Sequence, residues 1–204
     1  MTELTGREIF LNKLWPFVLE REIGLIETAY IFSKYGHRGQ RRDQGERYFE
    51  HPRSVAEIII DELGIKDNWE IIATALLHDM LEDSYLLNEE RIVINFGREV
   101  ALWVKMLTKK PKDGYISRLM NFAPWQVLVV KLADRLHNLR TLGDCTQQKQ
   151  VKQIIETRED YFPLCERLID ILPDDKKQIG RKLKKKLRRA CDHFEKKFMA
   201  QTAE

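Results

Sequence analysis

The sequence predicts an all-α protein, and three observations lead to this prediction. Its 204 residues include only 10 glycines and 6 prolines, and 43% of the residues are hydrophobic while 33% are charged. Such a balance is typical of a globular protein built from amphipathic helices. Apolar residues recur three and four positions apart along most of the chain, which is the spacing of one helix face. The length suits one domain with a sizeable core, so we expect a single helical bundle over residues 1–204.

The N-terminal region contains two predicted helices. Thr5 and Glu8 have the spacing of a capping box ahead of an apolar run, which predicts a helix within residues 1–20. A second helix is predicted over residues 21–35, where the apolar positions again follow the helical repeat. The polar, glycine-punctuated segment 39–45 is then expected to be a surface loop.

Two further helices are expected before residue 80. His51 and Pro52 open the first of them, because proline suits the first turn of a helix, where no amide hydrogen is needed. Asp67 and Glu70 are predicted to cap the second, which carries the continuous apolar run 71–77.

The second half of the chain also has a helical pattern. Gly97 is expected to interrupt the chain ahead of another helix. Segment 127–134 is rich in β-branched residues, but its apolar spacing continues beyond it and favours a helix over a strand. A long helix over 147–171, with a kink or boundary at Pro163, precedes a basic C-terminal helix over 174–200.

Composition and charge exclude several classes of protein. The N-terminus lacks a signal-peptide pattern, and no apolar run reaches the length of a membrane span, so we expect a cytoplasmic protein without a membrane partner. The three cysteines form no CxxC pair that would indicate a zinc ribbon. The net charge of +3 is too small to indicate nucleic acid binding. The basic run 181–189 has apolar residues at helical spacing, which favours an amphipathic helix docked on the core over a nucleic-acid contact.

Ionisable residues gather at the end of the apolar run 71–77. His78 and Asp79 follow it directly, and Glu82 and Asp83 come one helical turn later. Burying such groups unpaired would be costly, so they must be paired, exposed or bound to a cation. A His-Asp doublet offers one imidazole nitrogen and one carboxylate oxygen, a mixed set that suits a divalent metal such as Mn, Fe or Zn.

Two more ligand candidates occupy similar positions. His51 precedes a helix start, where it would otherwise be a cap or a loop residue. Asp134 follows an apolar run, so its carboxylate is expected to be buried and to require a cation, either a metal or a basic neighbour such as Arg135.

Three segments together resemble a known family: 37–52, 75–83 and 131–142. In residue order and spacing they are similar to the HD superfamily of metal-dependent phosphohydrolases. Within it they resemble the hydrolase domain of the RelA/SpoT group, which degrades (p)ppGpp, the alarmone of the stringent response. The resemblance covers residues 22–170 and leaves out the N-terminal helix and the basic C-terminal helix.

The resemblance implies both a metal and a catalytic pair. One divalent metal, usually manganese in this family, would be held by His51, His78, Asp79 and Asp134. Glu82 and Asp83 would orient or deprotonate the attacking water. The chain keeps this acidic pair, which members without hydrolase activity lose, so the resemblance favours an active enzyme.

A nucleotide site is implied as well. Arg42 would lie against the guanine base, and Tyr48, Asn138 and Thr141 would line the pocket. Arg41, Arg42 and Arg140 are the candidates for holding the phosphates by charge-assisted hydrogen bonds.

The expected reaction is hydrolysis of the 3′-pyrophosphate of (p)ppGpp to GDP or GTP and pyrophosphate. The resemblance implies a small stand-alone enzyme, for which a homo-oligomer is one possible state. Two alternatives stay open. The first is an HD phosphohydrolase acting on another nucleotide, since a fold does not fix a substrate. The second is a non-catalytic module that binds an alarmone or neutralises a toxic partner protein.

The sequence departs from the family pattern beside the expected polyphosphate. Asp43 stands where a basic residue is common, and Arg47 stands where proline is common. Arg41 and Arg47 could restore the positive charge that Asp43 removes.

Overall fold

The computed structural model describes residues 4–43, 45–84, 86–143 and 145–201. All the regular elements in these residues are helices, and extended backbone pairs only in an isolated bridge between Arg41 and Arg47. The predicted all-α fold class is therefore confirmed. None of the described helices is both long enough and apolar enough to span a bilayer.

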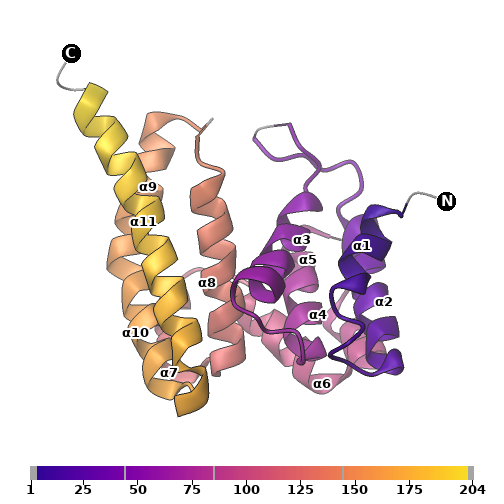
Figure 1. The fold of residues 1–204 in the computed structure, drawn as a ribbon. Helices are drawn as coiled ribbons and strands as arrows, with labels where there is room; N and C mark the ends of the chain where they lie inside the picture. The colour runs from indigo at the N-terminus through magenta and orange to yellow at the C-terminus, as the bar shows by residue number, and fades with distance from the viewer. Residues whose placement is uncertain (1–3, 44, 85, 144, 202–204) are drawn as a thin grey trace. The chain divides into compact units, whose positions relative to one another are not determined.

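The contacts within the chain define two compact units, residues 1–115 and residues 116–204. The first unit contains α1 (Gly6–Asn12), α2 (Glu20–Gly36), α3 (Glu50–Glu57), the π-helical turn η1 (Ile58–Glu62), α4 (Trp69–Leu77), α5 (Met80–Asp83) and α6 (Glu89–Leu107). Figure 1 shows these elements in indigo to pink.

Helix α4 is the centre of the first unit. It packs against α2, α3 and α6, and all of its residues from Ile71 to Leu77 are buried. A helix that is apolar on every side has to be enclosed by its neighbours, which explains why three helices surround it. Because α4 ends at Leu77, the next two residues, His78 and Asp79, lie at the end of the most enclosed helix of the unit.

The end of α2 lies very close to α5. A Cβ atom added at Gly36 would lie 2.2 Å from Met80 Cε, 2.7 Å from Met80 Sδ and 2.8 Å from Ser84 Oγ. Met80 is fully buried, so its side chain has little room to move. Gly36 thus lets α5, with Glu82 and Asp83, pack closely against α2.

We expect Gly36→Ala to lower the free energy of unfolding by about 1–3 kcal/mol, the usual cost of overpacking a core. Gly24→Ala in the same helix is the matched control. A Cβ at Gly24 meets no atom within 4 Å, so this change should be neutral or stabilise by roughly 0.5–1 kcal/mol. Urea unfolding measures both, and equal stability of the two variants would contradict the close packing.

The second unit contains the remaining helices. The boundary between the two units falls after Tyr115, the first residue of α7. These helices are α7 (Tyr115–Phe122), α8 (Trp125–Arg140), α9 (Gln147–Glu156), the π-helical turn η2 (Thr157–Tyr161), α10 (Phe162–Ile171), the 3-10 turn η3 (Asp174–Lys176) and α11 (Lys177–Gln201). Helix α8 covers the segment 127–134, so the choice of a helix over a strand is confirmed.

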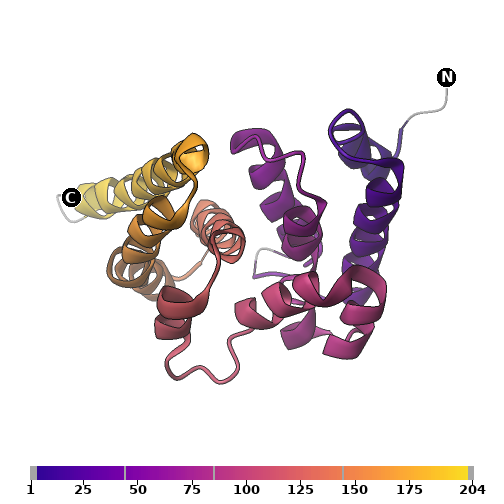
Figure 2. The ribbon, with the colours of Figure 1, turned by 90° about the horizontal axis from the view of Figure 1, so that it is seen from below.

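The basic helix α11 is docked on the core of its own unit. It packs against α8 and α10, and Figure 2 shows these helices side by side. Leu183, Leu187 and Phe194 are buried, as the helical spacing predicted, while Lys182 and Lys185 are exposed. The interpretation of this segment as an amphipathic helix with solvated lysines is therefore confirmed.

Some predicted boundaries need correction. The N-terminal helix expected within 1–20 is short: the Thr5 capping box forms, but α1 ends at Asn12, and turns lead to Pro16, which has no amide hydrogen to continue a helix. Asn68, rather than Asp67, caps α4, since its side-chain oxygen accepts a hydrogen bond from the amide of Ile71.

Two predicted interruptions are confirmed. Gly97 has φ 87° and ψ 170°, a non-helical conformation that glycine adopts readily, and it separates two helical segments of α6 at a kink. The long helix predicted over 147–171 is divided by η2, and Pro163 lies in the first turn of α10, where a missing amide hydrogen costs nothing.

Candidate metal centre and catalytic residues

Three of the predicted metal ligands converge in the first unit. His51, His78 and Asp79 each offer one ligand atom, and these atoms all lie within 4.8 Å of one another. Asp79 Oδ2 lies 3.2 Å from His78 Nε2 and 3.7 Å from His51 Nε2. Both imidazoles are buried, at 3% exposure each. Two nitrogens and one carboxylate oxygen around a common point form a donor set that fits a divalent metal.

The local fold explains this convergence. His51 is the second residue of α3, which packs against α4. His78 is the C-terminal cap of α4, and Asp79 is the residue before α5. The chain turns between α4 and α5, so that the side chains of His78 and Asp79 both reach the N-terminal end of α3.

A backbone contact sets the orientation of the His78 ring. Its Nδ1 lies 2.8 Å from the carbonyl oxygen of Ala75. Since a carbonyl oxygen only accepts, Nδ1 carries the proton and Nε2 keeps the lone pair that a metal needs. Histidine ligands are commonly held by such a bond from the other ring nitrogen, so this geometry also fits a metal site.

Tyr48 connects the candidate metal ligand Asp79 to the predicted catalytic residue Asp83. Its hydroxyl oxygen lies 2.9 Å from Asp79 Oδ2 and 3.0 Å from Asp83 Oδ2. The hydroxyl has one proton, so the two carboxylates share it as acceptors. Burial and the two carboxylates raise the pKa of Tyr48, which keeps the hydroxyl protonated. In the structure Tyr48 thus holds the two carboxylates, and its role in lining the nucleotide pocket stays a prediction.

We expect Tyr48→Phe to weaken metal binding by roughly 10- to 100-fold, the range found when a residue that orients a ligand is lost. Tyr35→Phe is the control, since Tyr35 is 58% exposed and the change is chemically identical. Calorimetric titration with Mn²⁺ measures the affinity, and thermal unfolding checks the fold. Equal Mn²⁺ affinity in the two variants would show that Tyr48 does not position Asp79.

The two predicted catalytic acids have different supports. Glu82 accepts a hydrogen bond from the backbone amide of Lys109, in the segment after α6. Asp83 contacts Tyr48, and its own carbonyl oxygen accepts a hydrogen bond from Gln40 Nε2 at 2.5 Å. Asp83 is therefore joined to the candidate metal ligand Asp79 through Tyr48, while Glu82 is restrained by the segment after α6.

His37 and Gln40 were given no role by the sequence, although they lie in the first family-like segment. His37 is 2% exposed, and its Nδ1 is 2.8 Å from Gln40 Oε1. Its ring stacks on that of Tyr48 with a centroid distance of 4.6 Å. Burial lowers the pKa of His37, so the ring is a neutral support for Tyr48. No sequence spacing marks this contact, because it joins the end of α2 to a loop residue.

Arg41 and Arg42, the predicted phosphate-binding arginines of the first unit, contact different residues. Arg42 Nη1 lies 3.8 Å from Glu46 Oε1. Arg41 donates a hydrogen bond to the carbonyl of Gly45 and lines a pocket with Arg47 and the end of α2. The structure therefore separates Arg41 from Arg42, although the two are adjacent in the chain.

The predicted site residues of the second unit lie along and just beyond the last turns of α8. Asp134 is 4% exposed, and its oxygens accept hydrogen bonds from Lys131 Nζ at 2.8 Å and Asn138 Nδ2 at 2.6 Å. Thr141 caps the helix by donating to the carbonyl of His137. The buried carboxylate and its pairing with a neighbouring basic residue were predicted, and that residue is Lys131. That Asp134 is a metal ligand stays a prediction.

Arg140 lines a pocket of its own unit, beside α11. The other basic residues of this pocket are Lys186, Arg189 and His193. The prediction that Arg140 binds phosphate also remains to be tested.

Comparisons with known proteins find several similar chains. A family model described as "HD domain" matches residues 29–169, which extend across both units. The chain is 38% identical over 156 residues to the GTP pyrophosphokinase rsh of Brucella melitensis, covering 71% of this chain and 20% of the relative. It is 34% identical over 171 residues to the bifunctional (p)ppGpp synthase/hydrolase SpoT of Escherichia coli K12, covering 78% of this chain and 24% of the relative. The chain thus spans only a fifth to a quarter of these curated relatives.

One solved structure has the same fold. It is described as a metazoan ortholog of SpoT that hydrolyzes ppGpp, and it superposes with a TM-score of 0.65 at 21% sequence identity. The match covers 93% of this chain and 98% of that chain.

Proposed function

The chain belongs to the HD domain family, and from this we propose that it is a metal-dependent phosphohydrolase that removes the 3′-pyrophosphate of (p)ppGpp. The observation that carries the proposal is the cluster of His51, His78 and Asp79, to which Tyr48 joins the carboxylate of Asp83. The named activities of the Escherichia coli and metazoan relatives support the choice of substrate.

We propose that the metal is Mn²⁺ and that Asp134 is its fourth protein ligand. A bound divalent metal supplies charge neutralisation at the attacked phosphoryl group and activates water. The donor set of imidazole nitrogens and carboxylate oxygens supports a metal of this class. Asp134 would have to exchange its contact with Lys131 for the metal, and its place in the third family-like segment supports such a role.

In the proposed reaction, water attacks the phosphorus next to the 3′ oxygen of the ribose. The bond between this oxygen and phosphorus breaks, and pyrophosphate and GDP or GTP are released. Glu82 or Asp83 accepts the proton of the attacking water. Arg42 would lie against the guanine base, and Asn138 and Thr141 would contact the nucleotide.

The test is pyrophosphate release from ppGpp by the purified chain after metal removal, with Mn²⁺, Mg²⁺ or Zn²⁺ restored. We expect release that depends on Mn²⁺. Other nucleotides, including deoxynucleoside monophosphates and adenine 3′-pyrophosphates, are the comparison substrates. If the chain hydrolysed one of these faster than ppGpp, that nucleotide would take the place of ppGpp in the proposal. If a folded, Mn²⁺-loaded chain hydrolysed none of them, the proposed enzymatic activity would be overturned.

A further inference from the structure

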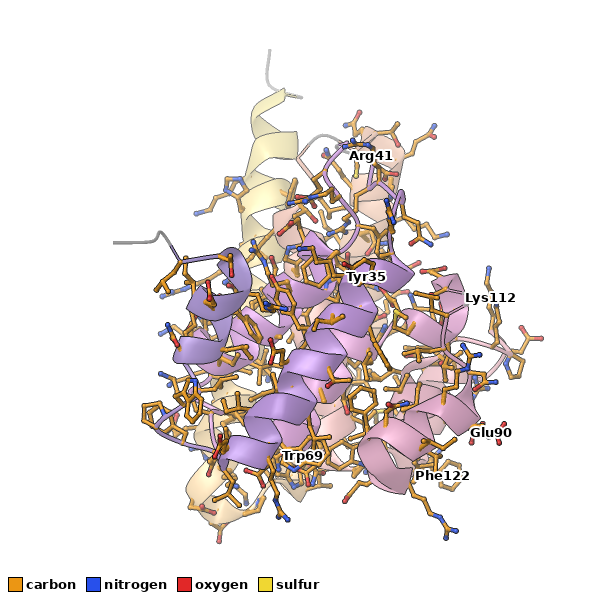
Figure 3. All side chains as sticks on the ribbon, turned by 90° about the vertical axis from the view of Figure 1, so that its right-hand side faces the viewer. Tyr35, Arg41, Trp69, Glu90, Lys112 and Phe122 are labelled. Atoms are coloured by element: carbon orange, nitrogen blue, oxygen red, sulfur yellow. The ribbon has the colours of Figure 1, made fainter. Side chains whose placement is uncertain are left out.

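A pocket of about 270 Å³ lies at the C-terminal end of α2. We call it the basic pocket. Its walls are the last residues of α2 and the loop that follows: Lys34, Tyr35, His37, Arg38, Gly39, Gln40, Arg41, Arg47 and Phe49. Figure 3 shows Tyr35 on α2 and Arg41 above it in the loop, on the same side of the unit.

The basic pocket has a strong positive charge. Lys34, Arg38, Arg41 and Arg47 line it, and none of the lining residues is acidic. Among the described residues, Lys34 and Arg38 form no ion pair, and Arg41 donates to a neutral carbonyl group. Arg47 is paired with Glu50 at 3.1 Å, but its side chain is 71% exposed, so this pair contributes little.

The backbone fixes the positions of these cations. The amide of Tyr48 donates to the carbonyl of Gln40 at 3.0 Å, and the amide of Arg42 donates to the carbonyl of Glu46 at 3.0 Å. These bonds flank the bridge between Arg41 and Arg47 and hold the two arginines across from each other. Like charges on paired strands repel one another, so an anion between them would relieve the repulsion.

We propose that the basic pocket binds a small, multiply charged phosphate anion of the size of inorganic pyrophosphate, at a place separate from the metal centre. Guanidinium groups suit phosphate because they donate two parallel hydrogen bonds to its oxygens. The volume falls below the roughly 300–1,000 Å³ of pockets that enclose a drug-sized ligand, which favours a small anion over a whole nucleotide. This site goes beyond the proposed hydrolysis and does not depend on it.

The pocket and the candidate metal centre share a wall. His37 and Gln40 line the pocket, while the His37 ring stacks on Tyr48 and Gln40 donates to the backbone of Asp83. The metal centre itself presents the carboxylates of Asp79, Glu82 and Asp83. Without a metal, these carboxylates repel an anion, so binding to the metal-free chain reports on basic surfaces alone.

The experiment is a calorimetric titration of the metal-free full chain with sodium pyrophosphate at constant ionic strength. We expect saturable binding of one pyrophosphate per chain, and binding at least about 10-fold weaker for the double variant Lys34→Gln/Arg38→Gln, because charge-assisted hydrogen bonds to the phosphate oxygens are lost. Both side chains are exposed, so the variant should fold, and circular dichroism checks this.

The matched control is Lys182→Gln/Lys185→Gln, which removes two positive charges from exposed positions of α11. This control should bind pyrophosphate as the unchanged chain does. Equal weakening by both double variants would indicate general attraction to a basic protein and overturn the proposal, as would unchanged binding in Lys34→Gln/Arg38→Gln. Neither metal nor ppGpp is present, so failure here is distinct from failure of the proposed hydrolysis.

Discussion

Asp79→Asn is expected to abolish metal binding and to lower the turnover of the proposed substrate by about 1,000-fold or more. Asp79 Oδ2 is the atom that both His51 and His78 approach, at 3.7 and 3.2 Å. Asparagine keeps the size of the side chain and an oxygen that Tyr48 can donate to, but it removes the negative charge. Loss of a metal's contribution of several kcal/mol to the barrier corresponds to a factor of this order.

Metal content by mass spectrometry and turnover of ppGpp together test this expectation. The chain should be loaded with Mn²⁺, passed through a desalting column and assayed beside the unchanged protein. Asp134→Asn should be examined in the same way, because an equal loss of metal would support its proposed role as the fourth ligand. If Asp79→Asn retained stoichiometric Mn²⁺, the site would have to be sought elsewhere.

Glu82→Gln is expected to separate metal binding from catalysis. The carboxylate accepts a hydrogen bond from the amide of Lys109, and a glutamine oxygen can accept the same bond, so its position should be kept. What is lost is the capacity to accept a proton, which typically contributes about 100- to 10,000-fold to a rate. We therefore expect a fall in kcat within this range with unchanged Mn²⁺ affinity.

Asp83→Asn is the comparison for this prediction, since either acid was proposed to accept the proton. A large fall in kcat for Glu82→Gln and a small one for Asp83→Asn would assign the proton to Glu82. The reverse result would assign it to Asp83 and contradict the prediction. A loss of Mn²⁺ in Glu82→Gln would instead indicate that this carboxylate supports the metal.

The helices were largely predictable because they follow local rules. The apolar run of α4 and the capping box at Thr5 are properties of neighbouring residues, and both are present in the structure. Errors arose where two neighbouring residues competed for one role. Asp67 and Asn68 are both good caps, and only the backbone path shows that Asn68 is used.

Three of the four candidate metal ligands could be grouped from the sequence, but the contacts that support them could not. His51, His78 and Asp79 could be identified from residue type, spacing and resemblance, and the structure brings them together. The contacts that hold them, such as that of Tyr48 with Asp79, link residues far apart in the chain. No periodicity encodes such contacts, and the separation of Arg41 from Arg42 likewise follows from a loop geometry that the sequence does not specify.

The end of α4 at His78 also has an electrostatic consequence. The peptide dipoles of a helix add up to a partial negative charge at its carboxyl end, and in α4 that end directly precedes His78 and Asp79. The nine-residue helix is enclosed by its neighbours, so water screens this charge poorly. A cation near His78 would therefore be attracted by the backbone of α4 as well as by its side-chain ligands.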